Sequence, residues 1–123
     1  IEVPMLIVGT VRDHVAPWPS VYKMHLLSDA ELTFVLTSGG HNAGVVSEPG
    51  HPRRSYQIAT RSVGARYVDP QTWRAETPLN EGSWWPAWQQ WLARRSTGRV
   101  APPAMSGTQP QLGDAPGTYV AMR

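Results

Sequence analysis

The chain contains no cysteine among its 123 residues. That absence excludes disulfide bonds within the chain and a thiolate nucleophile supplied by it. The sequence also lacks a Gly-x-Ser-x-Gly turn, the elbow on which many α/β enzymes present a catalytic serine. Any chemistry that needs a nucleophile must therefore take it from outside this sequence.

A marked excess of charge and long apolar runs are also missing. Eleven Lys+Arg against nine Asp+Glu give a formal net charge of +2, and the basic pairs Arg53-Arg54 and Arg94-Arg95 are interpreted as solvated surface. No apolar run approaches the roughly 20 residues that span a bilayer. No group of His, Asp and Glu has metal-ligand spacing. We expect no nucleic-acid partner, no transmembrane segment, no metal and, without a signal peptide, a cytosolic location.

What is present at the N-terminal end is the pattern of a βαβ unit. Val3–Gly9 is almost unbroken in its apolar character, which suits a strand buried on both faces. Helical spacing of apolar residues predicts an amphipathic helix over Trp18–Leu27, and Leu32–Thr37 is the second strand. We predict an α/β fold in which these two strands are parallel and joined by a right-handed crossover.

The remainder of the chain has weaker signals. From Val45 to Leu79 the pattern weakens and we assign no helix or strand: Glu48–Arg54 is interpreted as turn and loop, and Val63–Pro78 has no clear period. Ser83 is the predicted N-cap of a helix from Trp84 to about Arg95, with Gly98 ending it. Residues 99–123 are rich in Pro and Gly, so we expect a folded part over 1–98 and an extended tail over 99–123.

Three tryptophans of this predicted helix recur at helical spacing. Trp84, Trp88 and Trp91 fall at positions i, i+4 and i+7, so they share one helix face. Aromatic stripes of this kind are mostly core or docking surface, and substrate binding is the less favoured interpretation.

Asp13 and His41 follow the two predicted strands. The carboxyl ends of neighbouring parallel strands meet at one edge of a sheet, where α/β proteins place their sites. A histidine general base needs an aspartate on its far nitrogen, and the turn at Gly39-Gly40 lets His41 swing over the strand ends. The alternatives are a turn or capping role for Asp13 and an ordinary loop position for His41. His14 and His51 remain alternatives for the base.

Several strings resemble the C-terminal part of the poly(3-hydroxyalkanoate) synthases. They are Arg12-Asp-His-Val-Ala-Pro-Trp18, Thr33-Phe-Val-Leu-Thr-Ser-Gly-Gly-His-Asn-Ala-Gly44, Gly82-Ser-Trp-Trp-Pro-Ala-Trp88 and the closing Ala115-Pro-Gly-Thr-Tyr-Val120. The similarity extends over essentially the whole chain. It is greatest to the class I enzymes, which use a single type of subunit and favour short-chain substrates. Because the sequence opens on Ile1 inside a strand pattern, we interpret it as a piece of a longer protein.

The resemblance implies the C-terminal part of an α/β-hydrolase-like domain with a Cys-His-Asp triad. In it Asp13 is the triad aspartate and His41 the triad histidine, while the cysteine lies upstream. In this family the cysteine takes a (R)-3-hydroxyacyl group from coenzyme A, and the hydroxyl of the growing polyester then attacks the thioester. Whether His41 or Asp13 activates that hydroxyl stays open. No cofactor is implied beyond the coenzyme A thioester substrate.

The resemblance also implies partners and a location. They are the rest of the synthase, a second copy in a homodimer, and the surface of polyhydroxyalkanoate granules in the cytoplasm. Two other interpretations remain. One is the end of another α/β-hydrolase, such as a polyester depolymerase or esterase; the other is a non-catalytic docking module that uses the Trp84–Trp91 helix.

Two expectations concern the chain by itself. It should be inactive, because it carries no nucleophile. It should also fold poorly or self-associate, because a sheet of only two buried strands would lack neighbours and covering helices.

Overall fold

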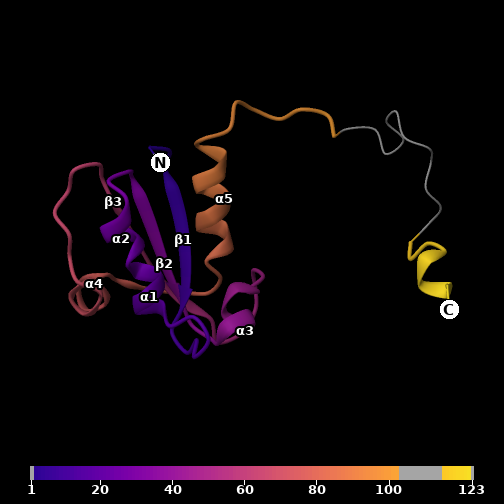
Figure 1. Ribbon diagram of the computed structural model, residues 1–123, viewed down its shortest axis with the longest axis horizontal. Helices are drawn as coiled ribbons and strands as arrows, with labels where there is room; N and C mark the ends of the chain where they lie inside the picture. The colour runs from indigo at the N-terminus through magenta and orange to yellow at the C-terminus, as the bar shows by residue number, and fades with distance from the viewer. Residues whose placement is uncertain (1, 103–114, 123) are drawn as a thin grey trace.

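A computed structural model of the chain describes residues 2–102 and 115–122. One mixed sheet has the strand order β1-β2-β3-β4, and Figure 1 labels its first three strands. Its strands are β1 (Met5–Thr10), β2 (Leu32–Thr37), β3 (Ser55–Arg61) and β4 (Leu79–Glu81). β1 and β2 are parallel, whereas β3 and β4 continue the sheet in antiparallel pairs. The predicted α/β class and the parallel first pair are confirmed.

The first strand begins two residues later than predicted. Pro4 has no N–H to give to a ladder, and the backbone pairing starts where Met5 donates to the Glu31 carbonyl at 2.9 Å. The strand then continues to Thr10, one residue beyond the predicted Gly9. The predicted bounds of the second strand, Leu32–Thr37, are those observed.

The helix predicted over Trp18–Leu27 is two short helices, α1 (Trp18–Tyr22) and α2 (Met24–Leu27). The division falls at Lys23. Its N–H donates to the Ser20 carbonyl at 3.3 Å, and its own carbonyl accepts from Leu26 at 2.8 Å. Both bonds join residues three apart, which is the tighter 3₁₀ spacing, so the α-helical ladder is interrupted there.

The prediction of no element between Val45 and Leu79 is wrong. This stretch contains β3 and α4 (Pro70–Glu76), and β4 begins at its last residue. The strand pattern of β3 was lost because the side that faces the core carries Gln57, whose side-chain amide donates to the carbonyls of Arg74 at 2.7 Å and Thr77 at 2.6 Å. A polar residue satisfied in this way is stable inside, but it breaks the apolar alternation on which the prediction depends.

Helices cover both sides of the sheet. α1, α2 and α4 lie on one side, and α5 (Trp85–Ala93) lies on the other (Figure 1). The core is on the α1 and α4 side, where rings from both helices pack on alternate residues of β2. Its buried members are Trp18, Tyr22, Leu32, Phe34, Leu36 and Trp73.

The last helix is shorter than predicted. Its N-cap residue is Trp84 rather than Ser83, although the Ser83 hydroxyl still accepts from the Trp85 N–H at 3.0 Å. It ends at Ala93, before the predicted Arg95, and the cap residue is Arg94. Residues 103–114 of the predicted tail lie outside the described residues. Within the described part of the tail, Tyr119–Ala121 form a single 3₁₀ turn (η1) whose residues are exposed.

The sheet has four strands rather than the two expected from the sequence. β3 supplies the second neighbour of β2, and all six residues of β2 are buried. β1 lies at the edge of the described sheet, and its first four residues are only half-buried.

Candidate active site

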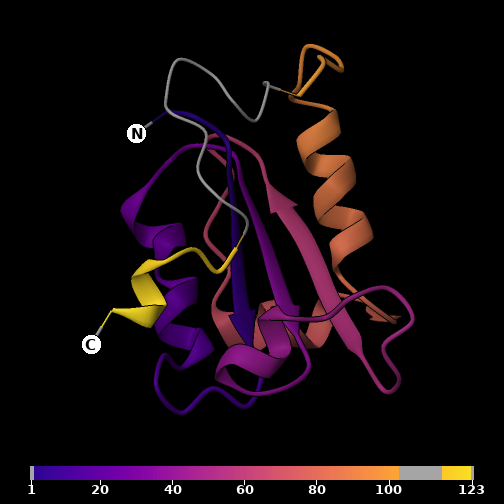
Figure 2. The same ribbon diagram turned by 90° about the vertical axis from the view of Figure 1, so that its right-hand side faces the viewer.

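The geometry brings Asp13 and His41 together at one edge of the sheet. Asp13 lies in the loop after β1, and His41 is the first residue of α3 (His41–Val45), the helix after β2. Figure 2 shows α3 lying across the carboxyl ends of these two strands. The Nδ1 atom of His41 is 2.8 Å from the Oδ2 atom of Asp13, a hydrogen-bond distance. The contact that the strand order predicts is therefore present.

The environment of Asp13 determines which atom carries the proton. Its Oδ1 atom accepts the Ala16 N–H at 2.8 Å and the Val15 N–H at 2.9 Å. The bond from Ala16, with those from His41 and Val15, holds the pKa of the Asp13 carboxyl below its usual value, so the group is a carboxylate at neutral pH. The expected turn role of Asp13 and its pairing with His41 thus coexist.

A carboxylate only accepts hydrogen bonds, so neutral His41 must donate from Nδ1. Its Nε2 atom then keeps a lone pair. Within residues 2–102 and 115–122 that atom has no hydrogen-bond partner, and the His41 side chain is 48% exposed whereas that of Asp13 is 7% exposed. The pair therefore presents one basic nitrogen to the outside and keeps its acidic member inside.

Two backbone bonds fasten the loops that carry these residues. Val11 N–H donates to the Thr37 carbonyl at 2.9 Å, and Arg12 N–H donates to the Gly39 carbonyl at 2.9 Å. Gly39 adopts φ +115°, where a side chain is disfavoured. A Cβ added to Gly44 would lie 2.6 Å from the Thr10 Cγ2 atom. α3 therefore lies closer to β1 than a residue with a side chain at position 44 would allow.

Neither of the alternative bases is hydrogen-bonded to Asp13. His14 is exposed, and no hydrogen bond joins it to Asp13. His51 lies in the loop before β3, where its Nδ1 donates to the Pro52 carbonyl at 2.9 Å and its Nε2 accepts from Arg54 at 3.3 Å. Among the described histidines, His41 alone contacts the Asp13 carboxylate.

The sequence analysis overlooked the fourth histidine, His25. It is 5% exposed, and burial together with the neighbouring Arg61 lowers its pKa to about 4. Trp18, Tyr22 and His25 recur at helical spacing, and this pattern in the sequence predicts that His25 lies on the buried face of the helix.

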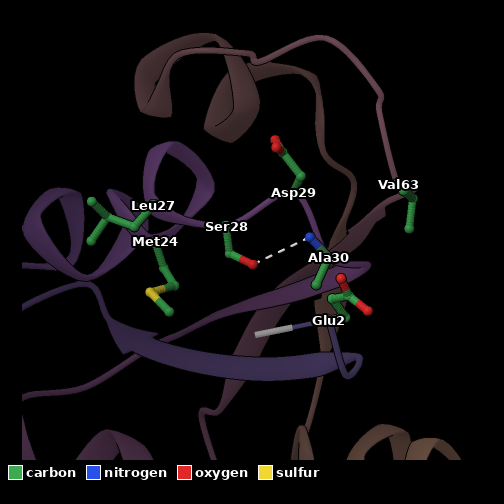
Figure 3. A pocket seen from close by; sticks show the side chains of 7 residues that line it. All are labelled: Glu2, Met24, Leu27, Ser28, Asp29, Ala30 and Val63. Carbon is green, nitrogen blue, oxygen red and sulfur yellow. Dashed lines mark hydrogen bonds between the residues drawn. The ribbon is translucent and has the colours of Figure 1, made fainter.

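A hollow of about 360 Å³ opens beside the pair. Its walls are mostly aliphatic, and Asp13 and His41 are its polar members apart from Thr10 and Asn42. A second hollow, of about 560 Å³, lies at the amino ends of the same two strands, and Glu2, Asp29, Met24 and Val63 are among the residues that line it (Figure 3). That hollow contains carboxylates but no base paired with them, so the first hollow is the candidate site.

Two further findings hold for residues 2–102 and 115–122. No three side chains of His, Cys, Asp or Glu are grouped so that they could hold a metal ion. In the same part of the chain, no helix is long and apolar enough to cross a membrane.

The fold and the site define the class of protein: a mixed α/β chain with a histidine–aspartate pair at the carboxyl ends of parallel strands. No family model matches the chain. It is 38% identical to poly(3-hydroxyalkanoate) polymerase 2 of Ectopseudomonas oleovorans over 125 residues, which cover 100% of this chain and 22% of that protein. It is also 38% identical to the PhaC polymerase subunit of Cupriavidus necator, over 98% of this chain and 20% of that protein.

A third relative, the poly(3-hydroxyalkanoate) polymerase of Methylorubrum extorquens, is 38% identical over 100% of this chain and 20% of its own length. The chain thus spans about a fifth of the length of the curated relatives it matches. It is similar to the C-terminal portion of the poly(3-hydroxyalkanoate) polymerases, as its motifs predict.

Proposed function

We propose that the chain is the C-terminal part of a polyhydroxyalkanoate synthase with an α/β-hydrolase-like catalytic domain. In this proposal His41 is the base, Asp13 orients it, and the nucleophilic cysteine comes from the upstream part of the polypeptide. The hydrogen bond of 2.8 Å between His41 Nδ1 and Asp13 Oδ2 is the observation that carries the proposal. Similarity to polymerases along the whole chain supports the choice of reaction.

The chemistry follows from the free nitrogen of His41. A thiol with a pKa near 8.5 is mostly protonated at neutral pH, so a neighbouring imidazole must accept its proton. The thiolate attacks the thioester carbonyl of the (R)-3-hydroxyacyl-CoA, and coenzyme A leaves with the proton from His41. In the next step the terminal hydroxyl of the polyester gives its proton to His41 and attacks the enzyme thioester. An ester bond forms and the cysteine sulfur is released.

The contacts of Asp13 support His41 as the base in the second step too. Both carboxylate oxygens of Asp13 already accept hydrogen bonds, from Val15 and Ala16 on one oxygen and from His41 on the other. With its side chain only 7% exposed, Asp13 has little room for a substrate hydroxyl. His41 has both the lone pair and the exposure that proton transfer requires.

The assembly and location expected from the resemblance remain part of this proposal: a single type of subunit acting as a homodimer, on granules in the cytoplasm. Sequence similarity to the polymerases is what supports them.

Asp13→Asn in the synthase that contains this chain tests the proposal. The amide keeps the shape of the side chain but is not a negative acceptor for the Nδ1–H of His41. We expect kcat for coenzyme A release from 3-hydroxybutyryl-CoA to fall by about 10²–10⁴-fold with little change in KM. An unchanged kcat would remove the pair from the reaction. Hydrolysis of simple esters without coenzyme A release by the native protein would instead favour the esterase alternative.

A further inference from the structure

The motif Gly82-Ser-Trp-Trp-Pro-Ala-Trp88 has no place in the chemistry described so far. Two of its residues, Ser83 and Trp85, donate hydrogen bonds to backbone carbonyls at the end of α3 and just beyond it. The Trp85 indole Nε1–H donates to the Val45 carbonyl at 3.0 Å. The Ser83 hydroxyl donates to the Ser47 carbonyl, and the same oxygen accepts the Trp85 N–H at 3.0 Å. Two hydrogen bonds therefore join this motif to Val45, the last residue of the helix that begins with His41, and to Ser47 just beyond it, while the third links Ser83 to Trp85 within the motif.

α3 needs such support because it is very short. It has five residues, no side-chain cap at its N-terminus, and exposed valines at its C-terminal end. Helices of this length are not stable by themselves, and the carbonyls of the last turn have no partner within the helix. The indole N–H of Trp85 satisfies one of these carbonyls from outside.

The attachments of α3 are distributed along its length. At its first residue His41 bonds to Asp13, in its middle Gly44 packs on Thr10, and at its end Val45 and the following Ser47 are held by the motif. If the last attachment is lost, the helix can turn about the tight contact at Gly44. That rotation would move the His41 ring relative to the carboxylate.

We propose that Ser83 and Trp85 are positioning residues for His41: by holding the C-terminal end of α3, they keep the imidazole aligned on Asp13. The proposal rests on the proposed function, because it assigns a role within that same site. It places the functional tryptophan outside the stripe of Trp84, Trp88 and Trp91, for which the sequence favoured a core or docking role.

The same helix supplies a matched control. Trp91 is half-buried, like Trp85, but its indole N–H is buried without a hydrogen-bond partner among the described residues. Trp85→Phe and Trp91→Phe therefore make the same chemical change in the same helix. Only the first removes a hydrogen bond to α3.

The test uses the intact synthase that contains this chain, with coenzyme A release from 3-hydroxybutyryl-CoA as the assay. We expect Trp85→Phe to lower kcat about tenfold with KM nearly unchanged, since a misplacement of about 1 Å can cost up to roughly 10²-fold. Trp91→Phe should leave both kcat and KM unchanged.

A pair of variants at Ser83 gives an independent test. Ser83→Ala removes the hydroxyl and should reproduce the kinetic change of Trp85→Phe. Ser83→Thr retains the hydroxyl and should keep the native kcat. This pair decides the matter if Trp85→Phe fails to fold.

His41→Ala in the same assay separates the two proposals. If it abolishes activity while Trp85→Phe and Ser83→Ala behave like Trp91→Phe, the positioning role is wrong and the proposed function stands. If His41→Ala itself retains full activity, the proposed function fails. An equal fall in kcat in Ser83→Ala and Ser83→Thr would indicate general structural damage and would also overturn the positioning role.

Discussion

Two histidines lie at opposite ends of the parallel strand pair, in contrasting surroundings. His41, at the carboxyl ends, is 48% exposed and hydrogen-bonded to a carboxylate. His25, near the amino ends, is 5% exposed, its ring lies 4.2 Å from that of Tyr22, and its Nε2 atom has no hydrogen-bond partner within the described residues. One ring can accept a proton and stabilise it, whereas burial and a guanidinium keep the other neutral.

The difference shows that residue type alone does not identify a base. An imidazole becomes useful for proton transfer when a carboxylate fixes its tautomer and water or substrate can reach its other nitrogen. A buried imidazole without a carboxylate instead behaves as an aromatic packing residue. Each prediction below either removes this contrast or measures it.

The largest effect is expected when the chain is assayed by itself. The carboxyl end of the strand pair then has the proposed base, His41, but not the proposed cysteine nucleophile, because the chain contains no cysteine. We expect no coenzyme A release from 3-hydroxybutyryl-CoA above the buffer blank. Turnover by the purified chain that disappears in His41→Ala would contradict this, since it would mean that the chain performs the reaction without the upstream cysteine.

Replacing each of the two histidines in turn in the intact synthase should give unequal losses of activity. His41→Ala should reduce the acylation rate by about 10²–10⁴-fold, the usual contribution of a positioned base. His25→Phe keeps a ring in the aromatic cluster and should change the rate by only about twofold. His14→Ala and His51→Ala serve as controls, because neither contacts Asp13. Equal losses in all four variants would remove the distinction between the two ends.

Gly44→Ala should damage the end that carries His41. The new methyl would lie 2.6 Å from Thr10 Cγ2 and 3.1 Å from the Ser38 carbonyl oxygen, so α3 must move away from β1. Overpacking of this kind costs about 1–3 kcal/mol in the free energy of unfolding. Gly40→Ala is the matched control, because the nearest atom to its added Cβ is 3.8 Å away. Melting temperatures and kcat should both fall in the first variant and change little in the second.

The smallest effect concerns the pH dependence of stability at His25. Its pKa is about 4 in the folded chain against the ordinary histidine value of 6.5, so the unfolded state binds the extra proton as the pH falls below 6.5. The contribution of neutral His25 to the free energy of unfolding is therefore fully present above pH 6.5 and declines as the pH falls toward 4. Between pH 7 and pH 5 we expect a loss of about 1–2 kcal/mol, at roughly 1.4 kcal/mol per pKa unit.

His25→Phe should reduce that loss, which thermal melting of the synthase at pH 7 and pH 5 can measure. Arg61 is the charged group beside the ring and remains in both proteins, so it does not confound the comparison. An identical pH dependence in the two proteins would show that His25 titrates as it does in the unfolded chain.

The part of this architecture that the sequence predicts is the part in which each residue follows the pattern of its element. The apolar strands, their parallel pairing and the meeting of Asp13 with His41 all depend on periodicity and on the geometry of a βαβ unit. β3 escaped prediction because Gln57 and Arg61 occupy positions on its core side, and their hydrogen bonds are visible only in three dimensions. The start of α4 carried a readable signal, Asp69 before Pro70, and the Asp69 side chain caps that helix.

The sequence predicts that Asp13 and His41 meet, but it does not predict the contacts that hold α3 beside them. Spacing along the chain places two loops at one edge, but it does not show that Trp85 reaches the carbonyl of Val45, forty positions earlier. Nor does it show that Gly44 touches Thr10. Such contacts depend on how α3 and α5 are placed on the sheet, which no local pattern encodes.

The side chain of Arg61 has a consequence for the order in which the chain becomes structured during synthesis. From the end of β3 its guanidinium donates to the carbonyls of His25, Ser28 and Ala30, which lie 36, 33 and 31 residues earlier. These carbonyls lie in α2 and in the segment between α2 and β2, so the crossover acquires its closing hydrogen bonds from a residue that leaves the ribosome well after both parallel strands. The strand pair that positions Asp13 and His41 therefore reaches its final form only when β3 has been added. Translation that stops before residue 61 leaves the crossover without these hydrogen bonds.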